Sequence, residues 1–525
     1  MAALFRVLTA VHLIYALHHQ AHLRCLLLLF WLMLPSLHAA GNFPITQFGA
    51  KGDGVTLNSG FIQKAIDAAA ASGGGAVIVP PGRFLTGSIA LRSNVTLHLQ
   101  KGAVLLGSTD RFLYRKINFY GLILAHNQRN IAITGEGVID GQGVELAQNT
   151  MKLHKAGKLP SDNEAERPTI IHFRKCDQVT VRQITLLQSA CWVQLYRECT
   201  NVLVENIKVR SCAAITNDGI DIDSCSNVVI RGCDIDSEDD GICLKSGPRF
   251  CENVLIEHCR VRSSCNAFKL GTASVKGFRN IVCRHLEIYD TYFSGIALEL
   301  VDGGVLENIS ISHVRMKTTN NPLFIRLGHR NANGPVGSLQ QVTISDVVAE
   351  IPNRRRSEMN KFPTYWRHNC TTLITGSITG LPGHPVRGIT LRNIDITYGG
   401  IGEKPLAGHQ LLEDLTKIPE CAKNYPESKM FGVLPAWGMY VRHAENLTME
   451  NVRFRVSGKD YRAAVLFDDV KGLQLQRCMV ASQGREPLWV MHDVCDARIS
   501  GTQSPRGSTR IFDQRGNNAD IQIKP

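Results

Sequence analysis

The chain has 525 residues, 44% of them hydrophobic and 20% charged, and it carries a formal net charge of +12. This is the composition of a folded globular protein, and it excludes a disordered or collagen-like chain. A positive charge of this size suits a polyanionic partner. Because no nucleic-acid-binding motif accompanies the charge, we expect an acidic polysaccharide and no nucleic acid as the partner.

Residues 1–40 differ from the rest of the chain. Arg24 precedes an uninterrupted apolar run that ends at Leu34, and the small residues Ala39 and Ala40 follow. A positive end, a short apolar core and small residues at a cleavage position are typical of a signal peptide, and the run is too short to span a bilayer comfortably. We therefore expect a signal peptide or another N-terminal export segment, a secreted or periplasmic protein, and no stable membrane association beyond this segment.

Residues 59–71 are predicted to form a helix, because apolar residues recur on one face of this segment. A short helix can cover the open edge of a sheet. An ordinary βαβ unit is the alternative, and nothing later in the chain supports it.

From Asn94 onward, an asparagine followed by alternating apolar residues recurs along the chain. The pattern begins at Asn94, Asn130, Asn201, Asn227, Asn253, Asn280, Asn308 and Asn446. Between Asn201 and Asn308 the spacings are 26, 26, 27 and 28 residues. Alternation indicates strands with one buried face, and a near-constant period indicates a stacked array. We predict an all-β fold, a right-handed parallel β-helix, in which residues 41–525 form a single domain and the asparagines stack into a hydrogen-bonded ladder.

The cysteines follow the same period. Cys199, Cys225 and Cys251 each lie two residues before a ladder asparagine. Stacked turns would pile them on one another as small apolar side chains. We expect mostly buried thiols, with a disulfide framework as the alternative.

A second alternation lies in the same coils. It covers residues 191–196, 218–223, 240–245, 266–271, 294–299 and 321–326. The third and fifth positions are always apolar and are predicted to face the core, so the first, fourth and sixth face outward. Neighbouring coils lie about 4.8 Å apart, so this register gathers five aspartates on one patch. They are Asp218, Asp221, Asp223, Asp239 and Asp240.

A patch of carboxylates is electrostatically unfavourable, since like charges raise one another's pKa. A purely structural surface would tend to avoid it. Acid–base catalysis needs it, because one carboxyl must stay protonated while another is ionised. The patch is therefore a candidate active site.

Two segments in consecutive coils carry a family resemblance. Residues 217–221 (Asn-Asp-Gly-Ile-Asp) and 238–241 (Glu-Asp-Asp-Gly) resemble the polygalacturonase family, family 28 of the glycoside hydrolases, whose members usually carry Asn-Thr-Asp-Gly and Gly-Asp-Asp there. The resemblance implies hydrolysis of glycosidic bonds in an acidic, plant-type pectic polysaccharide, without cofactor or metal. It implies that Asp239 is the general acid, that Asp218 and Asp240 hold and deprotonate the attacking water, and that the mechanism is inverting.

The chain also departs from the family pattern. Residues 265–267 (Cys-Asn-Ala) stand where the family carries Gly-His-Gly, and residues 297–299 (Ala-Leu-Glu) stand where it carries Arg-Ile-Lys. The family's basic residues grip galacturonate carboxylates, so we expect a substrate other than plain polygalacturonate, for example a rhamnogalacturonan. The candidate substrate-binding residues are Asp221, Asn266, Lys269, Glu299 and Arg326. Lys269 and Arg326 would replace the missing cations, or Arg326 would pair with Glu299 as a structural salt bridge.

Two other functions stay open. A polysaccharide lyase on the same fold would use Asp221, Asp223 and Asp236 as calcium ligands. A non-catalytic carbohydrate-binding β-helix would need aromatic platforms, and aromatic residues make up only 7% of the chain. Among them, Trp192 would either stack on a sugar or serve as packing. New reducing ends without unsaturated products would distinguish hydrolysis from both other functions.

Two long segments, near 350–370 and 399–437, interrupt the period. Loops of this length in a compact repeat are uncommon and usually functional. We expect them to wall off one end of the binding surface, so that the enzyme trims chain ends. Packing along the side of the solenoid, or joining subunits, is the alternative.

Overall fold

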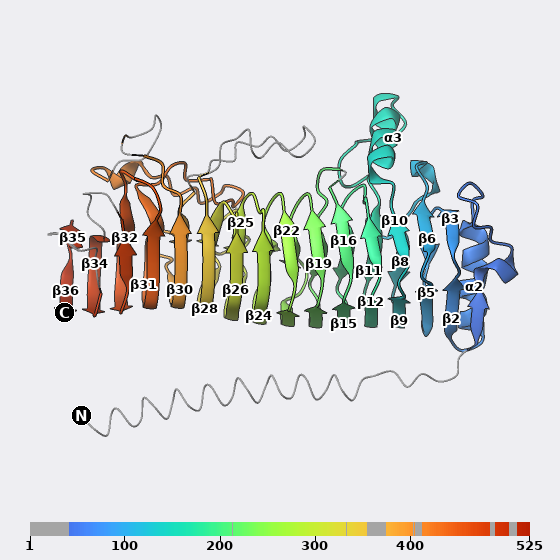
Figure 1. Ribbon diagram of the computed structural model, residues 1–525, viewed down its shortest axis with the longest axis horizontal. Helices are drawn as coiled ribbons and strands as arrows, with labels where there is room; N and C mark the ends of the chain where they lie inside the picture. The colour runs from blue at the N-terminus through green and yellow to red at the C-terminus, as the bar shows by residue number, and fades with distance from the viewer. Residues whose placement is uncertain are drawn as a thin grey trace, which may run out of the picture. The chain divides into compact units, whose positions relative to one another are not determined.

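The alternating segments form strands that stack side by side from β1 to β36, as Figure 1 shows. The computed structural model describes residues 41–212, 214–331, 333–353, 374–402, 404, 412–482, 489–502 and 512–524. The predicted export segment and most of the predicted loop near 350–370 lie outside these residues. The chain divides into Met1–Gly41 and Asn42–Pro525, and all the features below lie in the second unit. Within the described ranges, no helix is long and apolar enough to span a membrane.

The strand bounds fall into three groups along the chain. The first group is β1 (Asn42–Pro44), β2 (Gly75–Val79), β3 (Gly82–Thr86), β4 (Ile89–Ala90), β5 (Val95–Leu99), β6 (Ala103–Gly107), β7 (Arg115–Lys116), β8 (Tyr120–His126), β9 (Arg129–Thr134) and β10 (Val138–Asp140). The second is β11 (Thr169–Arg174), β12 (Asp177–Arg182), β13 (Thr185–Leu187), β14 (Gln194–Arg197), β15 (Thr200–Glu205), β16 (Lys208–Ser211), β17 (Ile220–Asp223), β18 (Ser226–Arg231), β19 (Asp234–Ser237), β20 (Ile242–Ser246), β21 (Cys251–Glu257), β22 (Arg260–Ser263) and β23 (Phe268–Ser274). The third is β24 (Gly277–Tyr289), β25 (Ser294–Leu300), β26 (Val305–Lys317), β27 (Asn321–Leu327), β28 (Ser338–Ile351), β29 (Gly376–Thr379), β30 (Val386–Tyr398), β31 (Ala436–Val456), β32 (Ala463–Gln476), β33 (Met479–Ala481), β34 (Trp489–Ser500), β35 (Phe512–Arg515) and β36 (Ala519–Lys524).

The strands pair in three parallel ladders, which confirms the parallel β-helix. One ladder runs β12–β15–β18–β21–β24 and carries the ladder asparagines. A second runs β13–β16–β19–β22. The third, which we call the site sheet, runs β11–β14–β17–β20–β23–β25–β27. One continuous apolar core extends between the ladders from Ile45 to Ile499.

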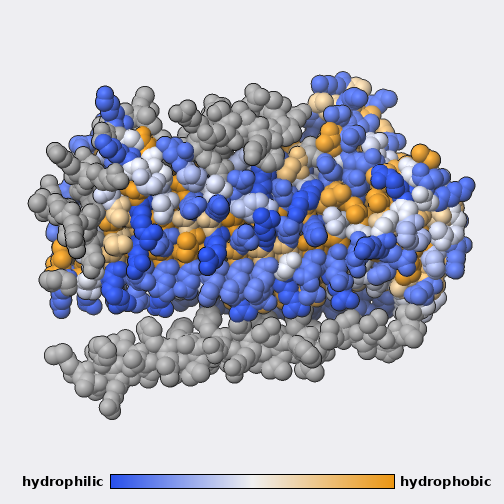
Figure 2. Space-filling view, viewed as in Figure 1, coloured by the Kyte–Doolittle hydropathy of each residue, from blue (hydrophilic) through white to orange (hydrophobic). Residues whose placement is uncertain are grey.

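The predicted asparagine ladder is present. Each ladder asparagine has a positive φ, and Asn253 donates from Nδ2 to Asn227 Oδ1 at 3.2 Å and accepts from Asn280 Nδ2 at 3.0 Å. Asn308 extends the ladder with a 2.7 Å bond to Asn280. Asparagine tolerates the left-handed region and supplies both a donor and an acceptor, so one residue type solves the turn in every coil. On the face that Figure 2 shows, hydrophilic residues accordingly form rows along the solenoid, with apolar patches between them.

The cysteines among the described residues are free thiols, most of them buried. Cys199 and Cys225 stack as predicted, and the backbone N–H of Cys199 lies 3.3 Å from Cys225 Sγ. The prediction of buried thiols is confirmed for the described residues.

The helices of the described ranges lie outside the stacked strands. The predicted helix is α2 (Ser59–Ala71), which packs on the first strands through Ile62, Ala65 and Ile66. A second helix, α3 (Gly143–Lys155), follows β10 and rises beside the solenoid in Figure 1. Short 3-10 helices are η1 (Ile45–Phe48), η2 (Arg111–Leu113) and η5 (Leu415–Lys417).

The outward register of the site sheet holds for five of the six predicted segments. Asp221 pairs with Cys243, Cys243 with Lys269, and Lys269 with Ala297, as the alternation requires. The register predicted for residues 191–196 is wrong by one residue, because Leu195 and not Gln194 aligns with Asp221.

Gln194 turns inward because its polar atoms find partners there. Its Oε1 accepts a 2.8 Å bond from the Tyr196 hydroxyl, and its Nε2 donates to Gly219 O at 3.2 Å. Tyr196, predicted to face outward, belongs to the core.

Replacement of Asn253 by alanine is expected to lower the free energy of unfolding by about 3–4 kcal/mol. The variant loses two side-chain hydrogen bonds, worth roughly 1 kcal/mol each, and forces a left-handed conformation that costs roughly 1–2 kcal/mol outside glycine and asparagine. Urea titration of Asn253→Ala and Asn253→Gly separates these effects. Both variants lose the side-chain hydrogen bonds, but glycine adopts the left-handed conformation without the backbone cost that alanine has. An unchanged midpoint for Asn253→Ala would show that the ladder does not stabilise the solenoid.

Candidate active site

Asp218 enters the site on a turn that a buried asparagine fixes. Asn217 donates from Nδ2 to Ser189 O at 3.0 Å and to Cys191 O at 2.9 Å. Its Oδ1 accepts from Ser211 Oγ at 2.9 Å. All side-chain hydrogen bonds of Asn217 are made with its own coil or the preceding one. Asp218 therefore has a defined position just before β17 of the site sheet.

Asp239 and Asp240 lie one coil later, between β19 and β20. The carbonyl of Asp239 accepts from Ser237 Oγ at 2.9 Å and from Ser263 Oγ at 2.7 Å, so serines of two coils hold the turn. The glycine after Asp218 and the glycine after Asp240 are steric requirements: a Cβ on Gly219 would lie 2.6 Å from the carbonyl oxygen of Gly241, and a Cβ on Gly241 would lie 2.6 Å from the carbonyl oxygen of Ala267. The two Asp-Gly pairs therefore follow from close stacking of the coils.

Lys245 joins two carboxylates of the preceding coil. Its Nζ lies 2.8 Å from Asp221 Oδ1 and 3.2 Å from Asp218 Oδ2. It also lies 3.1 Å from Cys243 Sγ. Because Asp221 is fully buried, this ammonium group is the cation that makes its burial possible.

Lys269 has the same role in the next coil. Its Nζ lies 3.1 Å from Asp240 Oδ2 and 3.5 Å from Glu299 Oε2. Asn266 donates to Asp240 Oδ1 from its backbone N at 3.2 Å and from Nδ2 at 2.9 Å. Asp240 therefore has one oxygen on a cation and the other on two amide donors.

These surroundings move the two central carboxyls in opposite directions. Desolvation and the negative charges of Asp218 and Asp240 raise the pKa of Asp239 well above its ordinary value. Burial also opposes ionisation of Asp240, but the charges of Lys269 and Lys245 outweigh it and hold the pKa of Asp240 below its ordinary value. Neighbouring carboxyls with divergent pKa values are the requirement for an acid and a base in one site.

Asp218 has an intermediate character. Burial raises its pKa, and the charge of Lys245 opposes that rise. Burial and the charge of Asp218 raise the pKa of Asp221 well above its ordinary value. Carboxylate or thiol atoms of Asp218, Asp240 and Cys243 lie within 4.8 Å of one another, close enough for Asp218 and Asp240 to hydrogen-bond one water between them.

Two groups of possible metal-ligating atoms occur among the described residues, and both contain Asp240. They are Asp218, Asp240 and Cys243, and Asp239, Asp240 and Cys265. Lys245 contacts the first group and Lys269 contacts Asp240, so ammonium groups already supply the positive charge that these carboxylates need.

The calcium ligands expected for a lyase do not converge. Asp221 pairs with Lys245, Asp223 with Arg197 at 3.3 Å, and Asp236 with Arg262 at 3.3 Å. A calcium ion needs six or more oxygens at one point. Three carboxylates that each pair with a different basic side chain do not provide that point.

The structure brings most predicted substrate-binding residues to the carboxylates. Lys269 and Asn266 contact Asp240 directly, and Glu299 contacts it through Lys269. These side chains are as deeply buried as Asp218 and Asp240. Their geometry favours positioning of Asp240, and direct contact with substrate stays a prediction.

Arg326 lies apart from this cluster. Its guanidinium donates to Gly380 O at 3.1 Å and to the carbonyl of Glu420 at 2.5 Å. Arg326 and Glu299 are neighbours in the sheet, but no ion pair joins them among the described residues. The structural salt bridge expected between them is wrong, because Glu299 has Lys269 as its cation instead.

Sequence reasoning left three residues of the site unassigned. Lys245 was visible in the outward register, beside the aspartates, but received no role. Trp192, for which sugar stacking and packing were equal alternatives, lies with its ring 5.7 Å from Lys245 Nζ. Tyr425, from the second long segment, lies with its hydroxyl 3.4 Å from Lys269 Nζ, and no local pattern in the sequence indicates it.

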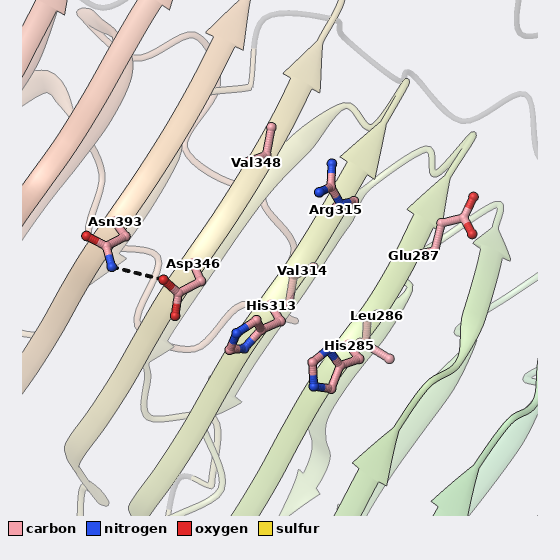
Figure 3. Close-up of a pocket in the computed structure, with 9 residues that line it drawn as sticks. All are labelled: His285, Leu286, Glu287, His313, Val314, Arg315, Asp346, Val348 and Asn393. Atoms are coloured by element: carbon pink, nitrogen blue, oxygen red, sulfur yellow. Dashed lines mark hydrogen bonds between the residues drawn. The ribbon is translucent and has the colours of Figure 1, made fainter.

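A second depression lies on another ladder and contains none of these carboxylates. It is a groove of about 600 Å³ on β24, β26, β28 and β30, and Figure 3 shows His285 and His313 side by side in it, next to the Asp346–Asn393 hydrogen bond. The imidazole rings of His285 and His313 are 4.7 Å apart between centroids. The groove follows from repetition of one turn position and is separate from the catalytic cluster.

A parallel β-helix that carries an acid with a raised pKa beside an ionised carboxylate has the fold and the paired carboxyls of a glycoside hydrolase. The chain matches the family described as "Glycosyl hydrolases family 28" over residues 74–408. It is 34% identical over 405 residues to a probable polygalacturonase from Vitis vinifera, with 69% of this chain and 75% of that protein covered. The chain belongs to family 28 of the glycosyl hydrolases.

Other relatives extend this similarity. The chain is 44% identical over 117 residues to an exo-poly-alpha-D-galacturonosidase from Dickeya chrysanthemi, a match that spans 19% of this chain and 19% of that protein. It is similar to the structure of an exopolygalacturonase from Thermotoga maritima, with 25% identity, a TM-score of 0.55, and 69% of this chain and 87% of that chain covered. The family 28 exopolygalacturonase of Yersinia enterocolitica, at 18% identity, shares the fold with a TM-score of 0.55 over 92% of this chain and 79% of that chain.

Replacement of Lys269 by methionine is expected to move the acid limb of the pH profile of kcat/KM upward by about one pH unit or more. Lys269 lowers the pKa of Asp240, so without it Asp240 takes up a proton at higher pH and activity is lost earlier as the pH falls. The measurement is kcat/KM on a pectic polymer against pH.

The exposed Lys208 serves as the control, because Lys208→Met removes the same charge from the outer surface. An acid limb that stays in place in Lys269→Met, in a variant that folds, contradicts the role of Lys269.

Proposed function

We propose that this protein hydrolyses glycosidic bonds in pectic polysaccharide and that residues 1–40 direct its export. The observation that carries the proposal is the placement of Asp218, Asp239 and Asp240 on consecutive coils, with Lys245 and Lys269 in direct contact with two of them. Membership of family 28 and the polygalacturonases among the relatives support the substrate class.

Asp239 donates a proton to the leaving oxygen. It is partly exposed, so a substrate can reach it, and its raised pKa keeps it protonated at the start of the reaction. Asp240 is ionised and accepts the proton of a water that it holds together with Asp218. The attack of this water on the anomeric carbon breaks the bond to the leaving oxygen.

We propose that the reaction inverts the anomeric centre, as the family resemblance implies. The nearest oxygens of Asp239 and Asp240 lie within 4.8 Å of each other. Acid and base of typical inverting glycosidases are roughly 6.5–9.5 Å apart, which leaves room for the water. The distance between the nearest oxygens of adjacent residues does not fix the separation of the two carboxyl groups across a bound sugar, so the anomeric configuration of the first product is the test of inversion.

The surroundings of Glu299 change what this residue implies for plain polygalacturonate as a substrate. Glu299 stands where the family carries a lysine, and an exposed carboxylate at this position would repel galacturonate. It is instead fully buried, it lies against Lys269, and burial raises its pKa to about 8, so it is largely uncharged at acidic pH. The premise of an exposed charge is wrong, and we propose polygalacturonate and rhamnogalacturonan as the two polymers to compare.

Hydrolysis is favoured over the two other functions. A lyase is disfavoured because its expected calcium ligands are each engaged by a different basic side chain. A non-catalytic binding protein is disfavoured because buried charges destabilise a fold unless they are paired. A protein that had lost catalysis would have no need to keep Asp240 buried and ionised beside Lys269.

We further propose that the enzyme trims chain ends, and residues 412–434, which we call the covering segment, carry this proposal. The outward positions of the site sheet change character after Lys269. The site sheet continues from β27 through β29, β31, β32 and β34. Apart from Ser377 on β29, its outward positions are apolar here, at Ala297, Phe324, Tyr440, Leu466 and Val490, and all of these side chains are fully buried. Leu415, Ile418, Phe431 and Leu434 of the covering segment pack on them in a second hydrophobic cluster.

Polar contacts hold the covering segment in place as well. Glu420 lies 3.0 Å from Arg442 Nη2 and 3.2 Å from His443 Nε2, and Ala422 O accepts from the backbone N of His329 at 2.7 Å. A surface that a packed segment covers cannot bind a continuing polymer. The C-terminal coils are therefore closed to the substrate, which suits a chain end.

Asp239→Asn is expected to lower kcat by at least about a hundredfold, because it removes the proton donor while keeping the shape of the side chain. New reducing ends and ultraviolet-absorbing unsaturated products are followed together on polygalacturonate and rhamnogalacturonan. Asp234→Asn, on the outer surface of β19 in the same coil, is the matched control. Near-normal turnover by Asp239→Asn would refute the assignment, and unsaturated products from the wild type would refute hydrolysis.

The end-trimming proposal predicts the time course of products. Mono- or disaccharide is expected to accumulate while the viscosity of the polymer falls slowly, because only chain ends fit beside the covering segment. Viscometry and chromatography of the same samples make the measurement. A rapid fall in viscosity with a ladder of oligomers would rule the proposal out.

A further inference from the structure

Each of the two lysines of the site lies under an aromatic ring. Lys245 Nζ lies 5.7 Å from the centroid of Trp192, and Lys269 Nζ lies 5.3 Å from the centroid of Tyr425. Lys245 is the partner of Asp218 and Lys269 is the partner of Asp240. The arrangement therefore occurs twice, once on each side of the carboxylates.

The rings of Trp192 and Tyr425 are accessible to a ligand, whereas the charged groups of Lys269 and Asp240 are buried. Tyr425 is 50% exposed and Trp192 is half-buried, whereas Lys269 is 2% and Asp240 is 3% exposed. A ligand that approaches the cluster therefore meets two aromatic faces together with Asp239.

The order along the solenoid places the carboxylates between the rings. Trp192 precedes β14, Asp218 and Asp240 precede β17 and β20, and Lys269, below Tyr425, lies on β23. Three coil spacings correspond to roughly 14 Å. The two faces are thus far enough apart for sugars on both sides of one bond.

Both rings are held in place before any ligand binds. Trp192 packs edge-to-face on Phe119, with centroids 4.9 Å apart. Arg330 lies 5.4 Å from the Tyr425 ring, and Asp302 fixes its guanidinium through bonds of 2.9 and 3.0 Å. A preorganised ring loses little freedom on binding, which favours it as a platform.

We propose that Trp192 and Tyr425 are the two sugar-stacking platforms of this enzyme, and that Tyr425 holds the sugar next to the covering segment, at the closed end. The apolar faces of pyranose rings pack on aromatic rings, and the cations beneath them are already paired with Asp218 and Asp240. This inference rests on the proposed hydrolysis of pectic polysaccharide and adds the residues that bind the sugars.

The test compares Tyr425→Ala, Tyr425→Phe and Trp192→Ala on whichever of polygalacturonate and rhamnogalacturonan the wild type hydrolyses faster. Each alanine variant is expected to raise KM about tenfold or more and to change kcat less than about threefold, while Tyr425→Phe keeps a KM close to that of the wild type. Tyr289, which stacks on Arg260 on a different ladder, supplies Tyr289→Ala as the matched control with unchanged KM.

The pH profile separates a platform from a support for Lys269. A platform leaves the acid limb of kcat/KM in place in Tyr425→Ala. An acid limb that moves upward, together with a Tyr425→Phe variant as defective as Tyr425→Ala, would show that the hydroxyl acts through Lys269, and it would overturn the proposal. So would an unchanged KM in both alanine variants.

A measurement of binding to an inactive variant distinguishes failure of the platforms from failure of the proposed function. Asp239→Asn is titrated calorimetrically with trigalacturonate and with a rhamnogalacturonan tetrasaccharide. The same titrations are made with the double variants that also carry Tyr425→Ala or Trp192→Ala. Loss of affinity in the double variants supports the platforms, and equal affinity overturns them. Absence of hydrolysis by the wild type on every pectic polymer would instead count against the proposed function.

Discussion

The spacing of about 4.8 Å between coils is the constraint on which the rest of this structure depends. It forces side chains at equivalent positions into columns, whatever their chemistry. Where the column is asparagine, the result is a ladder of hydrogen bonds. Where neighbouring coils carry aspartates, the result is a cluster of negative charges that would be unstable alone. The site exists because Lys245 and Lys269 occupy the same sheet one coil later than the carboxylates they neutralise.

The two lysines do more than compensate charge. Lys269 lies against Asp240 and Glu299, and no ion pair joins it to Asp239 among the described residues. Asp239 experiences mainly desolvation and the fields of Asp218 and Asp240, so its proton is retained while that of Asp240 is lost. One regular fold thus creates two chemical environments within one turn, because the carboxyl groups of adjacent residues point to different neighbours. Asp239 and Asp240 differ in surroundings, not in residue type.

The proposed closed end of the binding surface depends on a segment that is not part of the repeat. A solenoid tolerates long insertions at its bends, since each coil contacts only its neighbours. The covering segment is such an insertion. It buries the apolar outward positions of β25, β27, β31, β32 and β34, and it places Tyr425 beside Lys269. Its anchor at Glu420 involves His443, whose pKa is raised because burial is outweighed by the hydrogen bonds that the imidazole donates to the carboxylates of Glu420 and Asp469. The carboxylate cluster belongs to the repeat, and the segment that covers the apolar positions beside it belongs to the insertion.

The sequence by itself determined the parallel β-helix, the asparagine ladder, the buried thiols and the outward register of five segments, because all of these follow from a period that alternation makes visible. It also placed Asp218, Asp239 and Asp240 on one patch. Only the tertiary structure decided the register of residues 191–196, where Gln194 satisfies its polar atoms inside the core. Only the tertiary structure decided which carboxylate each lysine contacts, because a long side chain can reach a neighbouring coil in either direction. Only the tertiary structure placed Tyr425 beside Lys269, which lies more than 150 residues earlier in the chain. Contacts made by an insertion leave no periodic pattern in the sequence.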